Sequence, residues 1–98
     1  MFVLVVEMEI HIPYSRSLKE KRSVRRSLMD GLRRTFGVCI AEVDRPDAHQ
    51  VLALGATAVN GDVELLERMG RDIRSYVERR GDGMISTFRA ACLPWRWE

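Results

Sequence analysis

The sequence predicts a single α+β domain over residues 1–98, in which strands and helices follow the order βαββαβ. Three observations predict this class. The chain opens with a regular alternation of apolar and other residues, which is typical of a strand with one buried face. Two later segments carry apolar residues at helical spacing, and each stops at a glycine. The remaining three segments are short runs rich in β-branched and other apolar residues.

The first strand is predicted over residues 2–12, and Pro13 ends it. Ser17 and Glu20 then match the S-x-x-E capping box, in which each of the two side chains accepts a backbone N–H at the start of a helix. Gly37 stands where a glycine commonly ends a helix. The first helix is expected between these signals, with an apolar stripe made by Val24, Leu28, Leu32 and Phe36.

The second half of the chain repeats this pattern. Residues 38–43 and 51–59 are expected to form strands, Asp62 is the expected N-cap of a second helix, and residues 84–92 alternate as a last strand. Short connections and right-handed crossovers then favour a ferredoxin-like fold, a four-stranded antiparallel sheet with both helices on one face. One face of the last strand is expected to carry Met84, Ser86, Phe88, Ala90 and Cys92.

The composition is typical of a globular domain, with 46% hydrophobic and 31% charged residues. No apolar run approaches the ~18–20 residues that cross a bilayer, and no basic segment precedes the apolar start as in a signal peptide. We therefore expect a cytoplasmic protein without a membrane partner. In a reducing compartment, Cys39 and Cys92 are expected to be small buried hydrophobes rather than a disulfide.

Positive charge is concentrated in the first predicted helix. Between Arg16 and Arg34 the chain has eight basic and two acidic residues, a local charge of +6. The whole chain carries +2, so the remaining residues carry −4. This asymmetry predicts a polyanionic partner, because two acids are too few to pair eight bases within the helix. The alternative is a solvated helix face that binds no ligand.

Four of these cations are expected on one exposed stripe, here called the basic ridge: Lys19, Arg22, Arg26 and Arg33. Lys21 and Arg25 fall within the apolar stripe, where their stems are expected to cover the sheet edge while their charged heads reach water. Backbone N–H groups at the helix N-terminus would add donors for phosphate. The complete predicted anion-binding set is Arg16, Lys19, Lys21, Arg22, Arg25, Arg26 and Arg33.

The sheet face opposite the helices is expected to be apolar. If Leu4, Val6 and Met8 face the helices, the uncovered face would carry Val3, Val5, Val38, Ile40, Val51 and Ala53. A patch of this size on a small domain favours a homodimer. The alternative is that the C-terminal tail, with Trp95 and Trp97, covers the patch.

The sequence offers little for catalysis. Glu7, Glu9 and His11 share one strand face and His49 could join them, but a polar sheet face explains them more simply than a metal or acid–base site. No GxSxG, Walker A, HExxH or paired CxxC motif is present, and no phosphate loop of the acylphosphatase type follows the first strand. Residues 51–59 carry no aromatic on which RNA bases could stack. We expect a protein that is not an enzyme and needs no cofactor or metal.

Part of the chain resembles the YlxP-like family, a group of small bacterial proteins of unknown function. The resemblance is strongest in His11-Ile12-Pro13 and in Ser15-Arg16-Ser17-Leu18-Lys19-Glu20-Lys21-Arg22-Ser23-Val24. It continues through Ala41-Glu42-Val43-Asp44, Asp47, Gln50, Leu54-Gly55, Asn60 and Asp62. Arg25 departs from the family pattern, since relatives often have an aliphatic residue there, and His49 stands where an aromatic is expected.

The resemblance implies a ferredoxin-like fold and a bacterial cytosolic protein. Family members are often encoded near translation and ribosome-maturation genes, which favours RNA or the ribosome as a partner. No catalytic residues are established for the family, so none is carried over. Together with the basic helix, this predicts an RNA- or ribosome-associated accessory factor. The alternative is a homodimeric protein-interaction module that uses the open sheet face and has no nucleic-acid role.

Overall fold

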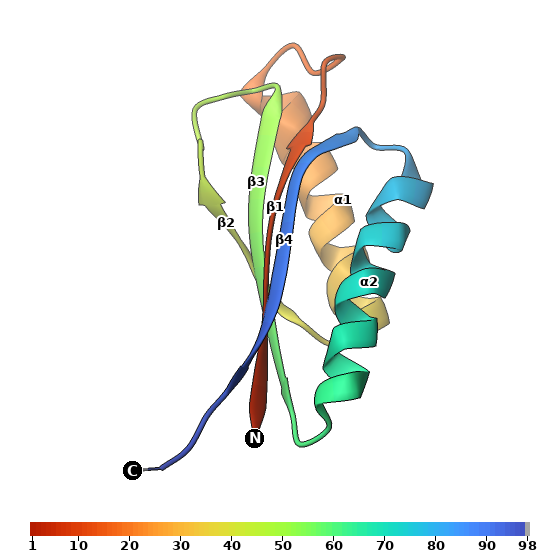
Figure 1. Ribbon diagram of the computed structural model, residues 1–98. Helices are drawn as coiled ribbons and strands as arrows, with labels where there is room; N and C mark the ends of the chain where they lie inside the picture. Colours follow the sequence, from red (N-terminus) through yellow and green to blue (C-terminus); the bar gives the residue numbers. More distant parts are fainter. Residues whose placement is uncertain (98) are drawn as a thin grey trace.

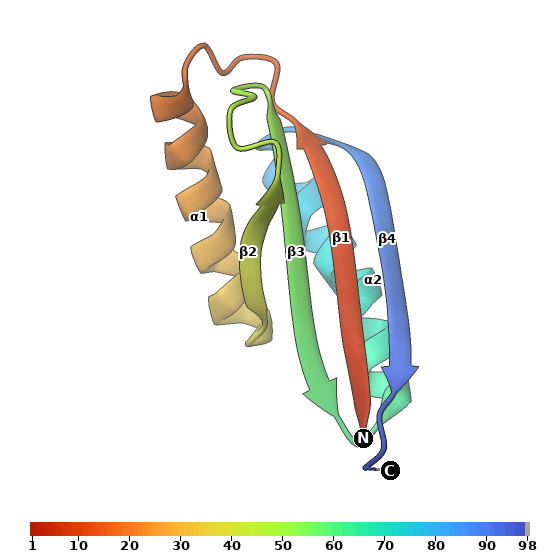
Figure 2. The same ribbon diagram turned by 90° about the vertical axis from the view of Figure 1, so that its left-hand side faces the viewer.

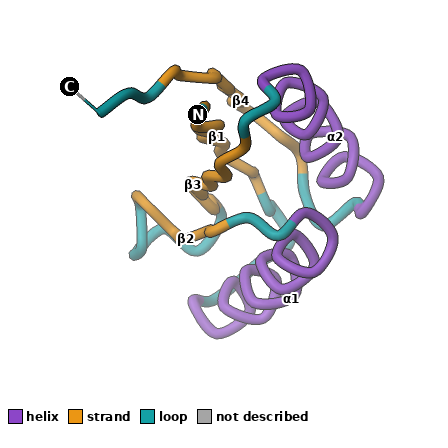
Figure 3. Tube along the Cα trace, turned by 90° about the horizontal axis from the view of Figure 1, so that it is seen from below, coloured by secondary structure: helices purple, strands orange, loops and turns teal. Residues whose placement is uncertain are grey.

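A computed structural model describes residues 1–97 of the chain. Its strands form a sheet in the order β2-β3-β1-β4, and every neighbouring pair is antiparallel. Both helices lie on the same face of the sheet, and the other face is open (Figure 1 and Figure 3). The predicted ferredoxin-like fold is confirmed. In chain order, the elements are β1 Phe2–His11, α1 Leu18–Phe36, β2 Cys39–Asp44, β3 Val51–Asn60, α2 Val63–Arg80 and β4 Met84–Pro94.

The predicted caps set the helix ends. The Ser17 hydroxyl accepts the Glu20 N–H at 3.1 Å, and the Asp62 carboxylate accepts the N–H groups of Glu64 and Leu65. Gly37 and Gly81 follow the two helices with φ of 67° and 71°, a left-handed conformation that glycine adopts without steric cost. None of the described helices is long and apolar enough to span a bilayer.

The core lies between the sheet and the helices. Every second residue of β1 points into it, and the stripes of both helices close over these side chains. Near the C-terminal end of α1, the Phe36 ring packs edge-on against Tyr76 of α2, with ring centroids 5.7 Å apart. The fully buried members include Leu4, Val6, Met8, Ile10, Leu28, Leu32, Leu52, Leu54, Leu66 and Ile73.

The pairing of β2 corrects one prediction. The expectation that Val38 and Ile40 lie on the open face is wrong, since each is only 5% exposed. Ile40 pairs with Ala56, which in turn pairs with Val6 on the buried face of β1. Apolar residues occupy both alternating positions of this segment, so its own pattern does not determine which set faces the helices. Val3, Val5 and Val51 lie on the open face as predicted. Ala53 lies on this face by its pairing with Glu9 but is only 3% exposed.

A shift in register corrects the predicted alternation of β4. The β1–β4 pairing shifts between Glu9 and Ile10, so that Ile85 lies opposite Ile10 on the buried face. Ser86 is therefore turned away from the core, and its hydroxyl donates to the Glu9 carbonyl oxygen at 3.2 Å. Figure 2 shows the sheet with β2 at one edge and β4 at the other.

Candidate nucleic-acid interface

The exposed side of α1 carries the basic ridge, as predicted. Its first three members lie at spacings of three and four residues, so they are neighbours on one helix face. Among residues 1–97, none of the three forms an ion pair. Unpaired cations on a helix surface keep their full capacity to bind phosphate. The shallow depression along this face is lined by Lys19, Arg22, Ser23, Arg26, Ser27 and Asp30.

Arg33, the fourth member of the basic ridge, has partners of its own. Its guanidinium lies 3.1 Å from the Asp30 carboxylate and reaches the Ile40 carbonyl oxygen at 3.4 Å. The pair is about half exposed, so it contributes little to stability, but it offsets part of the arginine's charge. The uncompensated charge of the ridge therefore lies in the N-terminal half of α1.

Arg16 lies just before α1 with an exposed side chain, and its backbone N–H donates to the Glu20 carboxylate at 2.7 Å. The Glu20 N–H is in turn bound by Ser17. A carboxylate thus already occupies the electropositive end of the helix. The helix N-terminus is consequently a poorer phosphate site than the sequence suggests, and the side chains of the ridge are the better one.

Lys21 belongs to the interior rather than to the surface. The expectation that its charged head reaches water is wrong, because the residue is 1% exposed. Its Nζ donates to the Arg45 carbonyl oxygen at 2.8 Å and lies 2.8 Å from Oε2 of Glu42. That carboxylate oxygen is off the hydrogen-bonding direction, so the second contact is an ion pair without a well-aligned hydrogen bond.

Arg25 shares the same carboxylate, with 2.7 Å between its guanidinium and Oε1 of Glu42. About a third of the Arg25 side chain is exposed, against 13% of Glu42. Sequence reasoning did not identify Glu42. In the structure it lies opposite Leu54, on the buried face of the sheet, which places it beneath α1. The ion pair therefore removes Lys21 from the predicted anion-binding set. Arg25 remains partly exposed, but its charge is largely offset by Glu42.

The polar patch on β1 is made by Glu7, Glu9 and His11, and both of its carboxylates lie next to arginines. Glu7 is paired with Arg89 of β4, and Glu9 lies 3.9 Å from Arg45. His49 lies exposed in the loop before β3. Within residues 1–97 there is no group of three or more His, Cys, Asp or Glu side chains arranged to hold a metal ion. The geometry is that of a polar sheet face.

The open face is partly apolar and uncovered. Four aliphatic residues on it are 42–61% exposed: Val5, Val43, Val59 and Leu93. Cys39 is also exposed there, so its predicted burial is wrong, because it lies on the outward face of an edge strand. The described part of the tail, up to Trp97, does not cover this face. Trp95 continues the pairing with Met1, while Trp97 is 92% exposed where the tail leaves the sheet (Figure 1).

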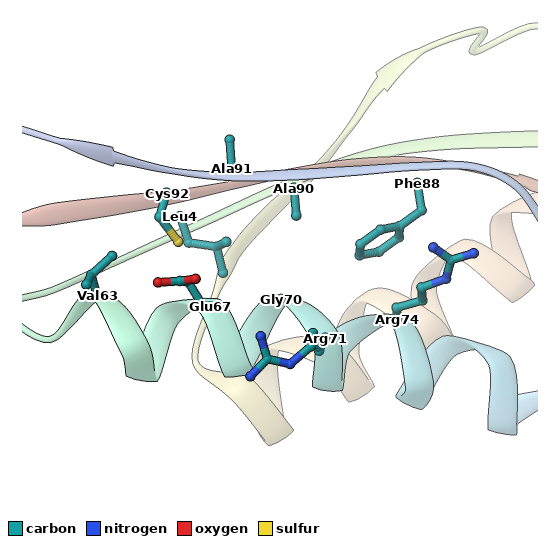
Figure 4. Close-up of a pocket in the computed structure, with 10 residues that line it drawn as sticks. All are labelled: Leu4, Val63, Glu67, Gly70, Arg71, Arg74, Phe88, Ala90, Ala91 and Cys92. Atoms are coloured by element: carbon teal, nitrogen blue, oxygen red, sulfur yellow. The ribbon is translucent and has the colours of Figure 1, made fainter.

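A groove of about 510 Å³ between α2 and β4 was not apparent in the sequence. Figure 4 shows Glu67 and Arg74 projecting from α2 toward β4, and Arg71 also lines the groove. The Arg74 guanidinium lies 5.3 Å from the centre of the Phe88 ring, a cation–π contact. Burial, and then the nearby Glu67 carboxylate, raise the pKa of the Cys92 thiol above its ordinary value.

Comparison with known families places the chain. A family model described as "Protein of unknown function (DUF503)" matches residues 3–90. The chain belongs to the DUF503 family. No functionally curated protein matches this DUF503 chain.

Two solved structures are similar to the DUF503 chain. The de novo designed protein Foldit4 aligns with a TM-score of 0.54 and 12% identity, over 97% of this chain and 98% of that one. An asparagine-to-alanine variant of SnoaB, a cofactor-independent oxygenase from Streptomyces nogalater, aligns with a TM-score of 0.46 and 14% identity, over 99% and 94% of the two chains. The first likeness shows the fold alone, and the second is too distant to bear on activity.

Proposed function

We propose that this DUF503 protein is a YlxP-like, cytoplasmic accessory factor, not an enzyme, that binds RNA or the ribosome through the basic ridge and Arg16. The observation that supports this most directly is the row Lys19, Arg22 and Arg26, whose charges have no acidic partner among the described residues. The three span about 10 Å along the helix axis, a length suited to consecutive phosphates. Contacts of this kind give binding that is sensitive to salt and weakly dependent on sequence.

Fluorescence anisotropy with a labelled RNA tests the proposal. For three phosphate contacts on a single strand, the affinity should fall about twentyfold between about 50 and 200 mM salt. Changing all three residues to Glu should abolish binding at low salt while the circular dichroism spectrum is retained. The variant is Lys19→Glu, Arg22→Glu, Arg26→Glu.

A matched variant controls for net charge. It makes the same three charge reversals at exposed arginines outside the ridge and should bind RNA nearly as well as the wild type. If the two variants lose RNA affinity equally, the loss reflects overall charge and contradicts the assignment of the ridge. Absence of RNA binding by the wild type at low salt would also contradict it. The control is Arg68→Glu, Arg79→Glu, Arg96→Glu.

The second candidate is a protein-interaction module, favoured by the exposed aliphatic residues of the open face and by a shallow apolar hollow around Gly55. In this role two copies would stack through their open faces. Val5→Glu or Val43→Glu should then convert a dimer to a monomer in multi-angle light scattering, without unfolding the chain. A dimer that survives both changes would exclude this surface.

A further inference from the structure

Among residues 1–97, no strand pairs with the outer edge of β4. β4 is the end strand of the sheet and runs for 11 residues, of which only Arg89 is charged. The opposite edge, β2, has six residues, includes Glu42 and Asp44, and has a register irregularity between them. The irregularity of β4 lies at Ser86, and the pairing with β1 is regular from Thr87 to Pro94. Short, charged and irregular edges resist pairing with other strands, whereas long and uncharged ones invite it. The two edges of this sheet thus differ in their readiness to accept a further strand.

The pairing with β1 determines which backbone groups of β4 point outward. Trp95 donates its N–H to the Met1 carbonyl oxygen at 2.9 Å, and the Met1 amino group reaches the Trp95 carbonyl at 3.4 Å. Because bonded and non-bonded pairs alternate along an antiparallel ladder, Leu93, Ala91 and Arg89 also turn their backbone groups toward β1. The N–H and C=O groups of Phe88, Ala90 and Cys92 therefore point away from the sheet. Pro94, the next outward position, has no N–H to leave unpaired.

The groove beside this edge carries complementary charge. Glu67 lies toward the N-terminal end of α2, and Arg71 and Arg74 lie beyond it along the helix. Among residues 1–97, neither Glu67 nor Arg71 forms an ion pair, and Arg74 has only a contact of 3.9 Å with Glu78. If two copies of α2 lie side by side in opposite directions, the acidic side chain of each helix lies beside the basic side chains of the other.

We propose that a second copy of this chain pairs its β4 antiparallel with this β4, around a two-fold axis at Ala90, to form a continuous eight-stranded sheet. Ala90 would then exchange two backbone hydrogen bonds with Ala90 of the second copy. Phe88 would do the same with Cys92 of the second copy, on both sides of the axis. The inference goes beyond the proposed function and does not depend on it.

The axis at Ala90 also brings the charges together. A Cβ built on Gly70 would lie 3.6 Å from Cβ of Ala90, so Gly70 marks the level of the axis on α2. At about 1.5 Å per residue, Glu67 lies about 4.5 Å from this level on one side and Arg74 about 6 Å on the other. In the reversed second copy, Glu67 comes level with Arg74 of the first copy and within reach of Arg71. The same contact recurs across the axis.

The edge is a better surface for a second copy than the open face. Stacking two open faces would take the Glu7–Arg89 pair and Glu9 out of water, which costs free energy unless new partners compensate. Edge pairing gives hydrogen bonds to unpaired backbone groups and leaves the open face exposed. It also leaves the basic ridge free, because α1 packs beside β2 at the other end of the sheet.

Charge exchange between two variants tests the proposal by multi-angle light scattering and sedimentation equilibrium. The wild type should be a dimer. Glu67→Arg or Arg74→Glu should each raise the dissociation constant at least about tenfold, because like charges then meet at both symmetric contacts. An equimolar mixture of the two variants should dimerise again, since opposite charges then meet at both contacts of the mixed dimer. Asp72→Arg, an exposed charge reversal on α2 outside the groove, should leave the dimer unchanged.

Several results would overturn the inference. They are a wild type that stays monomeric at millimolar concentration, a dissociation constant that is unchanged in Glu67→Arg, and a mixture of variants that dimerises no better than either variant alone. A dimer that is lost in Val43→Glu but kept in Glu67→Arg would place the second copy on the open face instead. The variants of the basic ridge should retain the dimer, so failure of RNA binding and failure of edge pairing are distinguishable.

Discussion

The two helices follow the same local rules but differ in their charge. Each begins at a side-chain cap, is followed by a glycine in the left-handed conformation, and buries one apolar stripe on the sheet. α1 carries seven basic and two acidic residues, whereas α2 carries five and four. Either pattern suits an exposed helix face, so the fold does not require the difference. Caps and stripes encode the helices, and the surface charge is the part of the sequence free to encode a partner.

The helices differ in their interior as well. The buried residues of α2 are Leu66, Gly70, Ile73 and Val77, all without charge. α1 buries Lys21 beside Leu28 and Leu32, and supplies it with the Glu42 carboxylate. A buried ion pair of this kind adds little net stability, but removal of one partner is costly because the other charge remains in a poorly solvated place.

Lys21→Met should therefore have the largest effect on stability. It leaves the Arg45 carbonyl oxygen with only the Ala48 N–H as donor and Glu42 with only Arg25 as a cation, so the free energy of unfolding should fall by about 3 kcal/mol. Urea denaturation followed by circular dichroism measures this. Lys19→Met, an exposed change of the same type two residues away, should alter stability by no more than about 0.5 kcal/mol.

A second change separates loss of charge pairing from loss of packing. In Lys21→Met combined with Glu42→Leu, both buried charges are replaced by apolar groups, so much of the lost stability should return. Arg25 is partly exposed and can turn to water. If the double variant is less stable than Lys21→Met, the ion pair is not the cause of the loss. If Lys21→Met and Lys19→Met behave alike, the buried position of Lys21 is contradicted.

The sequence predicted the fold well because its signals are local. Ser17, Asp62, Gly37 and Gly81 are individually recognisable, and the alternation in β1 is unambiguous. Once these signals fix the order of elements, short connections leave few ways to close the sheet.

The sequence was a weaker guide where a property depends on pairing between distant segments. The phase of β2 follows from its register with β3, and the burial of Lys21 follows from that phase, which turns Glu42 toward α1. Helical periodicity placed Lys21 in the apolar stripe but could not supply its partner. The groove beside β4 depends on where α2 lies over the sheet, which no local signal in the sequence determines.

Each helix contains one glycine in its interior, and replacing it by alanine should change stability in opposite directions in the two helices. A Cβ on Gly70 would make ordinary contacts of 3.5 and 3.6 Å with Leu4 and Ala90, so Gly70→Ala should gain helix propensity and stabilise the fold by up to about 1 kcal/mol. A Cβ on Gly31 of α1 would overlap the Tyr76 hydroxyl, so Gly31→Ala should destabilise it despite the same gain. Thermal denaturation of dilute protein should show shifts of opposite sign. Tyr76→Phe should relieve the loss in Gly31→Ala, and equal shifts in both helices would refute the close approach of α1 to α2.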